Sequence, residues 1–89
     1  MTKPPAEPAE TENTILRLLD ERGGGRSISP TDVACALTEG SDWHLQMPGV
    51  RRAAIKLALA GRLVITRKGK PVDPNDFKGV YRLVPPTRD

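Results

Sequence analysis

Residues 63–84 read LVITRKGKPVDPNDFKGVYRLV, and this stretch predicts a β-hairpin near the end of the chain. Its first part, Leu63 to Thr66, is rich in β-branched side chains, and its last part, Val80 to Val84, alternates side chains between two faces. Glycines and prolines make residues 67–79 a long, partly stiff connecting loop. Because two strands alone do not form a stable sheet in water, the hairpin must pack on helices from the rest of the chain.

The sequence Ser29-Pro30-Thr31-Asp32 is the clearest start signal for a helix. Ser29 suits the N-cap and Pro30 the first helical position, while Asp32 places a negative charge near the positive end of the helix dipole. We expect this helix to end at Gly40. The side chains expected to be buried on it are Val33, Ala34, Cys35, Ala36 and Leu37.

An earlier helix is predicted after a polar N-terminal segment. Residues 1–12 contain three prolines and three glutamates, a composition that cannot bury a core and predicts a disordered tail. Thr11 or Asn13 can cap the helix that follows. The three glycines at residues 23–25 should stop it, because their backbone has too much freedom to remain helical.

A third helix is predicted from about Met47 to Ala60, after a loop over residues 41–46. Pro48 suits its first turn, and Gly61 suits a left-handed stop. At 100° per residue, one broad face is apolar and the opposite face carries the basic residues. The apolar face is formed by Val50, Ala53, Ala54, Leu57, Ala58 and Ala60.

The predicted order of elements is helix, short strand at Arg26 to Ile28, helix, helix, strand, long loop and strand. Three helices closed by a C-terminal hairpin are typical of the winged helix, a relative of the helix-turn-helix. We therefore predict an α+β fold, mainly α, with a winged-helix domain over residues 13–84. A disordered tail over residues 1–12 and a C-terminal tail over residues 85–89 would flank it. The third helix would be the recognition helix, and residues 67–79 the wing.

Three segments carry a resemblance to a known family: Trp43 with Met47-Pro48 and Val50-Arg51, Leu57-Ala58 with Gly61-Arg62, and ITRKGKPVDP at residues 65–74. Over about residues 14–84 the chain resembles a family of short, uncharacterised bacterial proteins classed as a domain of unknown function. The stretch Lys68 to Pro74 is the most specific part of the likeness. The resemblance implies a winged-helix fold and implies no activity.

The positive charge is concentrated in the second half of the chain. The net charge is +3, but residues 41–84 carry +6 and the remainder −3, which indicates a surface that faces a polyanion. In a winged helix, Arg51 and Arg52 would enter the major groove, where an arginine can bond two acceptors of guanine. We therefore expect double-stranded DNA as the partner. The residues predicted to bind it are Arg51, Arg52, Lys56, Arg62, Arg67, Lys68 and Lys70.

A protein-interaction module or homodimer on the same fold is the alternative hypothesis. Ile55, Leu59, Trp43 and the loop from Pro71 to Pro74 would then form the contact surface, and the basic residues would only keep the protein soluble. Two wing carboxylates, Asp73 and Asp76, count against DNA because they repel phosphate. A lone tryptophan before a helix more commonly covers the core than stacks on a base, so we expect Trp43 to do so.

The remaining composition argues against catalysis, cofactors and membranes. With 89 residues the chain has little room for a large concave site, so we expect no enzyme. Cys35 is the single cysteine, expected to be buried and inert, and His44 has no second ligand at a usable spacing, so no metal or cofactor is expected. No apolar run approaches the roughly 20 residues of a membrane span, and no signal-peptide core is visible, which predicts a cytoplasmic protein.

Overall fold

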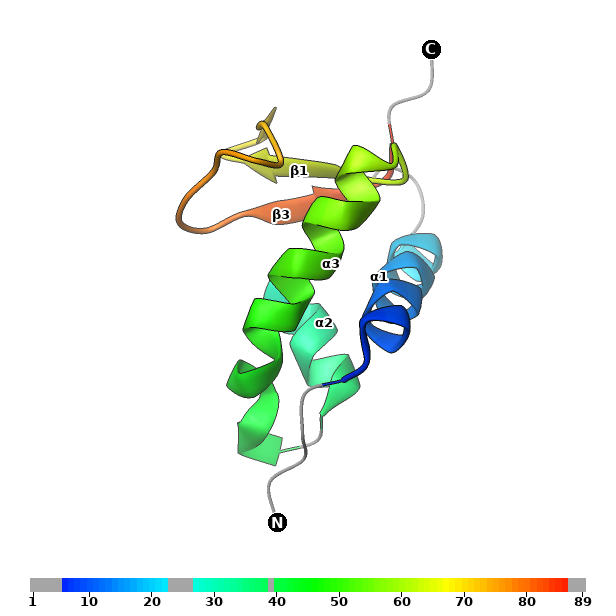
Figure 1. The fold of residues 1–89 in the computed structure, drawn as a ribbon. Helices are drawn as coiled ribbons and strands as arrows, with labels where there is room; N and C mark the ends of the chain where they lie inside the picture. Colours follow the sequence, from blue (N-terminus) through cyan, green and yellow to red (C-terminus); the bar gives the residue numbers. More distant parts are fainter. Residues whose placement is uncertain (1–5, 23–26, 39, 87–89) are drawn as a thin grey trace.

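The computed structural model describes residues 6–22, 27–38 and 40–86, in which the helices pack together beneath a small sheet (Figure 1). The segment between the last two strands swings out to one side before it returns to the sheet (Figure 1). The fold is α+β, mainly α, and the order of its elements is consistent with a winged-helix-like arrangement. The elements are α1 (Pro8–Arg22), α2 (Pro30–Leu37), η1 (Gly40–Gln46), α3 (Met47–Leu59), β1 (Val64–Arg67), β2 (Lys70–Pro71) and β3 (Arg82–Val84).

The sheet has the order β2-β1-β3 and is antiparallel. β1 pairs with β3 so that Ile65 lies opposite Leu83. Leu83 also forms a bridge with Ile28, and their backbones exchange two hydrogen bonds of 2.8 and 2.9 Å. Where a short strand was predicted, the structure thus has a single bridging residue, Ile28, and no strand, while Arg26 lies outside the described residues.

The hairpin contains a strand that the sequence did not predict. β2 lies within the predicted loop over residues 67–79 and pairs Lys70 with Arg67. Lys68 and Gly69 form the two-residue turn between them, with φ angles of 52° and 79°. Such a turn matches the twist of two adjacent strands, so the chain folds straight back on β1 instead of leaving the sheet.

The two predicted strands begin later than expected. β1 spans Val64–Arg67 and β3 begins at Arg82 rather than at Val80, which is 85% exposed and precedes the ladder. The predicted alternation is confirmed, since Tyr81 and Leu83 are both buried while Arg82 is exposed. The strand bounds shifted because β-propensity does not reveal where pairing with the neighbouring strand starts.

The start of α2 follows the sequence signal, but its end and its outer face do not. Ser29 Oγ accepts a hydrogen bond from the Asp32 amide, and Asp32 Oδ2 accepts one from the Ser29 amide, both at 3.0 Å. The helix ends at Leu37 with Thr38 as C-cap, before the predicted stop at Gly40. Cys35 and Ala36 are exposed, because at 100° per residue they lie away from the face buried by Val33, Ala34 and Leu37.

α1 begins earlier than predicted. It starts at Pro8 instead of Thr11 or Asn13, so residues 8–12 of the predicted disordered tail are helical. Thr11 is buried in this first turn, where its hydroxyl donates to the Glu7 carbonyl at 3.2 Å. A proline at the first helical position suits this start. The glycines at residues 23–25 lie outside the described residues, as do residues 1–5 and 87–89.

α3 packs against α1 and α2 and carries the central part of the core. Gly61 follows it with a φ of 77°, as predicted, whereas Ala60 is exposed because it lies beyond the last helical residue. The segment before α3, predicted as a loop, forms the 3-10 helix η1. In the described part of the chain no helix combines the length and apolar character that crossing a bilayer requires. The large core side chains include Ile15, Leu19, Ile28, Val33, Leu37, Val50, Leu57, Leu63, Ile65, Phe77, Tyr81 and Leu83.

Candidate nucleic-acid interface

The basic residues of α3 point in three different directions. The helix buries Val50, Ala53, Ala54 and Leu57, and it contains no Asp or Glu. Arg51 lies on one flank, against the segment that leads into β3, and Lys56 lies on the other flank, against α1. Arg52 lies between these flanks and is exposed. Of the two arginines predicted to enter a groove, only Arg52 therefore has its side chain on the outer face.

Arg51 is bound within the protein. Its Nη2 donates to the Phe77 carbonyl at 2.7 Å, and its guanidinium carbon lies 4.0 Å from the centre of the Phe77 ring. The ring of Tyr81 lies further away, at 5.9 Å. Phe77 and Tyr81 are buried and meet edge to face at 5.1 Å. The guanidinium thus forms both a hydrogen bond and a cation–π contact with one residue of the wing.

Tyr81 contributes a buried polar group to this cluster. Its hydroxyl has no hydrogen-bond partner among the described residues. Burial raises the pKa of Tyr81 to about 12, and the nearby positive charge of Arg51 acts in the opposite direction with a smaller effect. The side chain therefore remains neutral at physiological pH, and we assign it no proton-transfer role.

Arg67 is also engaged with the segment before β3. Its Nε donates to the Val80 carbonyl at 3.1 Å. A Cβ atom added to Gly79 would lie 3.1 Å from Nη2 of Arg67, so the guanidinium rests directly against this glycine. Gly79 also has a φ of 80°, which an L side chain rarely adopts. Arg51 and Arg67 thus bind the two ends of the segment Phe77 to Val80.

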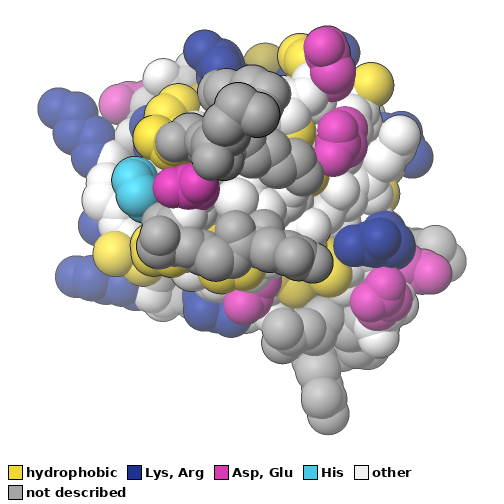
Figure 2. Space-filling model, turned by 90° about the horizontal axis from the view of Figure 1, so that it is seen from below, with side chains coloured by type: hydrophobic (Ala, Val, Ile, Leu, Met, Phe, Trp, Pro, Cys, Tyr) yellow, Lys and Arg dark blue, Asp and Glu magenta, His cyan; other side chains and the backbone are white. Residues whose placement is uncertain are grey.

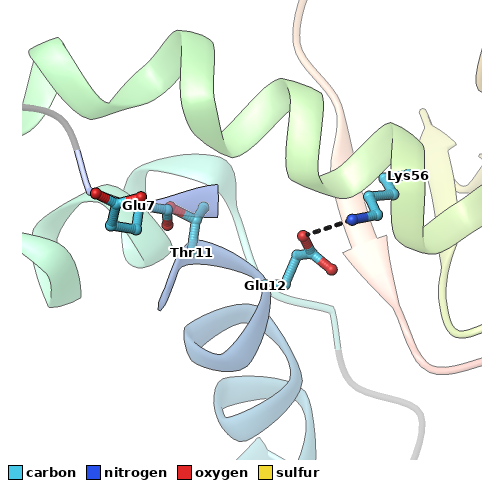
Figure 3. A network of polar contacts seen from close by, with 4 residues as sticks. All are labelled: Glu7, Thr11, Glu12 and Lys56. Atoms are coloured by element: carbon cyan, nitrogen blue, oxygen red, sulfur yellow. Dashed lines mark hydrogen bonds and ion pairs between the residues drawn. The ribbon is translucent and has the colours of Figure 1, made fainter. Parts of the chain in front are cut away.

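Lys56 of α3 forms an ion pair with Glu12 of the neighbouring α1 (Figure 3). Lys56 Nζ lies 3.3 Å from Oε2 of Glu12, and the two side chains are 72% and 19% exposed. Because the Lys56 ammonium is largely exposed, this ion pair stabilises the protein by about 0–1 kcal/mol. The ammonium is accessible from solvent, whereas the Glu12 carboxylate beside it is mostly buried.

The other predicted residues are exposed. They have no hydrogen bond or ion pair from their side chains within residues 6–22, 27–38 and 40–86. Lys78 was not among the residues predicted to bind DNA, but its side chain is likewise exposed. The signal that could have found it was its position in the basic second half of the chain, beside Gly79. These exposed cations are Arg52, Arg62, Lys68, Lys70 and Lys78.

The cations do not form one continuous patch on the face seen in Figure 2, which views the molecule from the end opposite the sheet. Dark blue side chains stand at separate places around the outline, with Asp and Glu side chains among them (Figure 2). Two smaller groups are set by the backbone: Arg52 and Lys56 on successive turns of α3, and Lys68 and Lys70 around the β1–β2 turn. Asp73 is exposed beyond β2, and its Oδ1 accepts a hydrogen bond from the Asn75 amide at 2.9 Å.

The residues predicted for a protein-interaction surface differ in their exposure. Trp43 is half-buried and packs on the core, as predicted, with the exposed His44 ring edge-on at 6.0 Å. Ile55 is also half-buried and packs on the core. Leu59, by contrast, is 61% exposed at the end of α3. Among the described residues no group of three His, Cys, Asp or Glu side chains could hold a metal ion.

A comparison with protein-family models matches residues 8–86, nearly the whole described chain, to a family described as "Protein of unknown function (DUF3253)". A comparison with curated proteins finds no match.

Proposed function

Because the chain belongs to the DUF3253 family, whose description states no activity, we propose its function from its charge and fold: it binds double-stranded DNA through α3 and the β1–β2 hairpin. The observation that carries this proposal is one of charge. Residues 47–72 span both elements, contain seven Lys and Arg residues and contain no Asp or Glu. Counterion release from DNA by such cations is the main source of affinity in complexes of this kind.

The roles of the predicted residues follow from their contacts. Arg52 occupies the outer face of α3 and is the candidate for a base edge in the major groove, where its fork suits guanine. Lys56 lies one turn further along, and although it pairs with Glu12 its side chain is exposed and can reach a phosphate. Arg62, Lys68 and Lys70 complete the set of phosphate contacts, which position the protein without reading sequence.

The backbone of Lys68 supports this assignment. Within the described residues Lys68 is the one non-glycine side chain with a positive φ, at 52°. Asparagine, aspartate or glycine suits this turn position better, and an L side chain in the left-handed region costs about 1 kcal/mol or more. Strain of this kind is found where a particular side chain is needed, and a cation at the tip of a hairpin has such a use.

The test is a titration of a fluorescently labelled duplex by anisotropy at several salt concentrations. With about four phosphate contacts, log K should fall with log salt with a slope of about −4. The double variant Lys68→Ala/Lys70→Ala should reduce the steepness of that slope by about 2. Arg17→Ala is the control, because it removes an exposed charge from α1, where Arg17 pairs with Glu21 at 3.5 Å. Absence of binding at low salt, or an equal loss in the control, would contradict the proposal.

A protein-interaction module remains the second candidate, and the exposure of Leu59 favours it. In that case Leu59→Asp should abolish association of the protein with itself in sedimentation velocity, while the double lysine variant should leave it unchanged. If the wild-type protein is monomeric at all concentrations, the protein does not associate with itself, and self-association is excluded as its function.

A further inference from the structure

We propose that Arg51 and Arg67 are positioning residues that fix the segment from Phe77 to Val80, and through it the wing, against α3, and that neither arginine contacts DNA. The second part rests on the proposed function, whereas the first concerns the free protein. Both arginines belong to the set predicted to bind DNA. They lie on different elements, α3 and β1, yet both donate hydrogen bonds to carbonyls of one short segment.

The segment has few other attachments. Residues 72–81 form no helix or strand, and between β2 and β3 the chain is held mainly by the buried side chains of Phe77 and Tyr81. The Val72 amide bonds to the Ile65 carbonyl at 3.0 Å, which ties down only the beginning of the segment. The end nearest β3 turns at Gly79, where no side chain is available for packing.

Arg51 supplies the attachment to α3. Its planar guanidinium covers the Phe77 ring and bonds to the carbonyl of the same residue at 2.7 Å, so one side chain fixes both the ring and the backbone. A lysine or an apolar residue cannot form this pair of contacts with the same geometry. To bind a phosphate, Arg51 would have to give up both contacts.

Arg67 supplies the attachment to the hairpin. It ends β1, directly before the turn formed by Lys68 and Gly69, and it pairs with Lys70 in the sheet. Its hydrogen bond to Val80 therefore links the turn end of the hairpin to the segment that Arg51 holds on α3. Together the two contacts determine where the Lys68 and Lys70 charges lie relative to Arg52. That distance decides whether the cations of the hairpin and those of α3 can bind the same duplex.

The first experiment needs no DNA. Backbone ¹⁵N relaxation gives order parameters for residues 77–80. In the wild-type protein these should be about 0.85, the value of a rigid backbone. Arg51→Met and Arg67→Met keep most of the aliphatic side chain and should lower these values to about 0.6. Arg52→Met and Lys70→Met are the matched controls and should leave them unchanged. Unchanged values in both Arg51→Met and Arg67→Met would overturn the proposal.

The second experiment measures the salt dependence of duplex binding. Arg51→Met and Arg67→Met should weaken binding several-fold and leave the salt slope unchanged, whereas Arg62→Met and Lys70→Met, which remove proposed phosphate contacts, should each reduce its steepness by about 0.9. A reduction of about 0.9 in Arg51→Met would show a direct phosphate contact and overturn the assignment. If the order parameters fall as expected but no variant binds DNA, the positioning role stands and the proposed function fails.

A double-mutant cycle with Phe77→Leu provides a check that does not depend on the stability of a single variant. Phe77 is buried, so it can influence DNA binding only through the residues it holds. If Arg51 acts through Phe77, the effects of Arg51→Met and Phe77→Leu on affinity should not add. Additive effects would place Arg51 on the DNA and overturn the proposal.

Discussion

Gln46 Nε2 donates a hydrogen bond of 2.8 Å to Oγ1 of Thr38, and both side chains are almost completely buried. The same amide accepts a bond of 2.8 Å from the Ala6 backbone through Oε1. One side chain therefore joins the residue that caps α2, the residue that precedes α3, and the chain just before α1. These contacts join the start of α1, the end of α2 and the start of α3 at a single point.

Replacement of Gln46 by alanine should therefore be costly. Gln46→Ala leaves the Thr38 hydroxyl and the Ala6 amide without this partner, and we expect the free energy of unfolding to fall by about 2–3 kcal/mol. Urea denaturation followed by circular dichroism measures the change. Thr31→Ala, at an exposed position of α2, is the control and should cost less than about 0.5 kcal/mol. A loss in Gln46→Ala no larger than in this control would contradict the role of the amide.

Tyr81 should make the protein sensitive to alkaline pH. Its pKa is raised by burial to about 12 from the usual 10.0, so the unfolded chain loses the phenol proton before the folded protein does. The stability that the neutral phenol contributes is fully present below pH 10.0 and is lost as the pH rises from there to about 12. Tyr81→Phe should remove this loss, and at neutral pH it should be neutral or stabilising by up to about 1 kcal/mol, because the hydroxyl has no partner among the described residues.

Two measurements check this behaviour. Tyr81 is the single tyrosine, so the absorbance of tyrosinate reports its titration in the folded protein directly. Urea unfolding at pH values on both sides of the window then compares wild-type protein with Tyr81→Phe. Titration near the ordinary pKa of tyrosine, or an alkaline loss of stability that is the same in both proteins, would contradict the expectation.

Cys35 should react readily in the native protein. Its side chain is exposed on α2, contrary to the sequence prediction of a buried thiol. A disulfide reagent that releases a coloured thiol should therefore modify one cysteine per chain without denaturant, at a rate within about tenfold of that in urea. Cys35→Ser gives the background and is the suitable parent for binding and sedimentation experiments. Modification that requires denaturant would contradict the exposure of the thiol.

Local signals in the sequence predicted the parts of the fold that local physics decides. The capping residues at Ser29 and Asp32 and the left-handed Gly61 depend on neighbours within a few positions. α2 has only eight residues, most of them apolar, so its sequence did not distinguish the buried face from the face that carries Cys35. That distinction depends on which side α1 and α3 cover.

The candidate site was predicted only in part, for a related reason. Positive charge and helical spacing grouped Arg51 with Arg52, because adjacent arginines look alike in a sequence. Their difference depends on Phe77, which is far along the chain and reaches Arg51 only after the wing has folded. Arg67 likewise meets Val80 through the tertiary structure. A charge pattern can therefore predict that a surface is basic, but it cannot show which cations are bound within the protein.

The turn residue Lys68 offers a test in which stability and DNA binding should change in opposite directions. Lys68→Asn places the favoured Asn-Gly pair in the β1–β2 turn, where φ is 52° at residue 68 and 79° at Gly69. Asparagine tolerates the left-handed region better than lysine does, so the free energy of unfolding should rise by about 0.5 kcal/mol. The same change removes a cation from the hairpin tip, and the salt slope for duplex binding should become less steep by about 0.9.

Lys70→Ala separates these two effects. Lys70 lies in β2 and is exposed, and its φ is not positive, so its replacement removes the same charge without relieving the backbone. We expect the same change in salt slope and no gain in stability. If Lys68→Asn lowers stability, the backbone at residue 68 is not strained. If it raises stability and leaves the salt slope unchanged, the Lys68 charge does not contact a phosphate, and the retention of lysine in this turn requires a reason other than DNA.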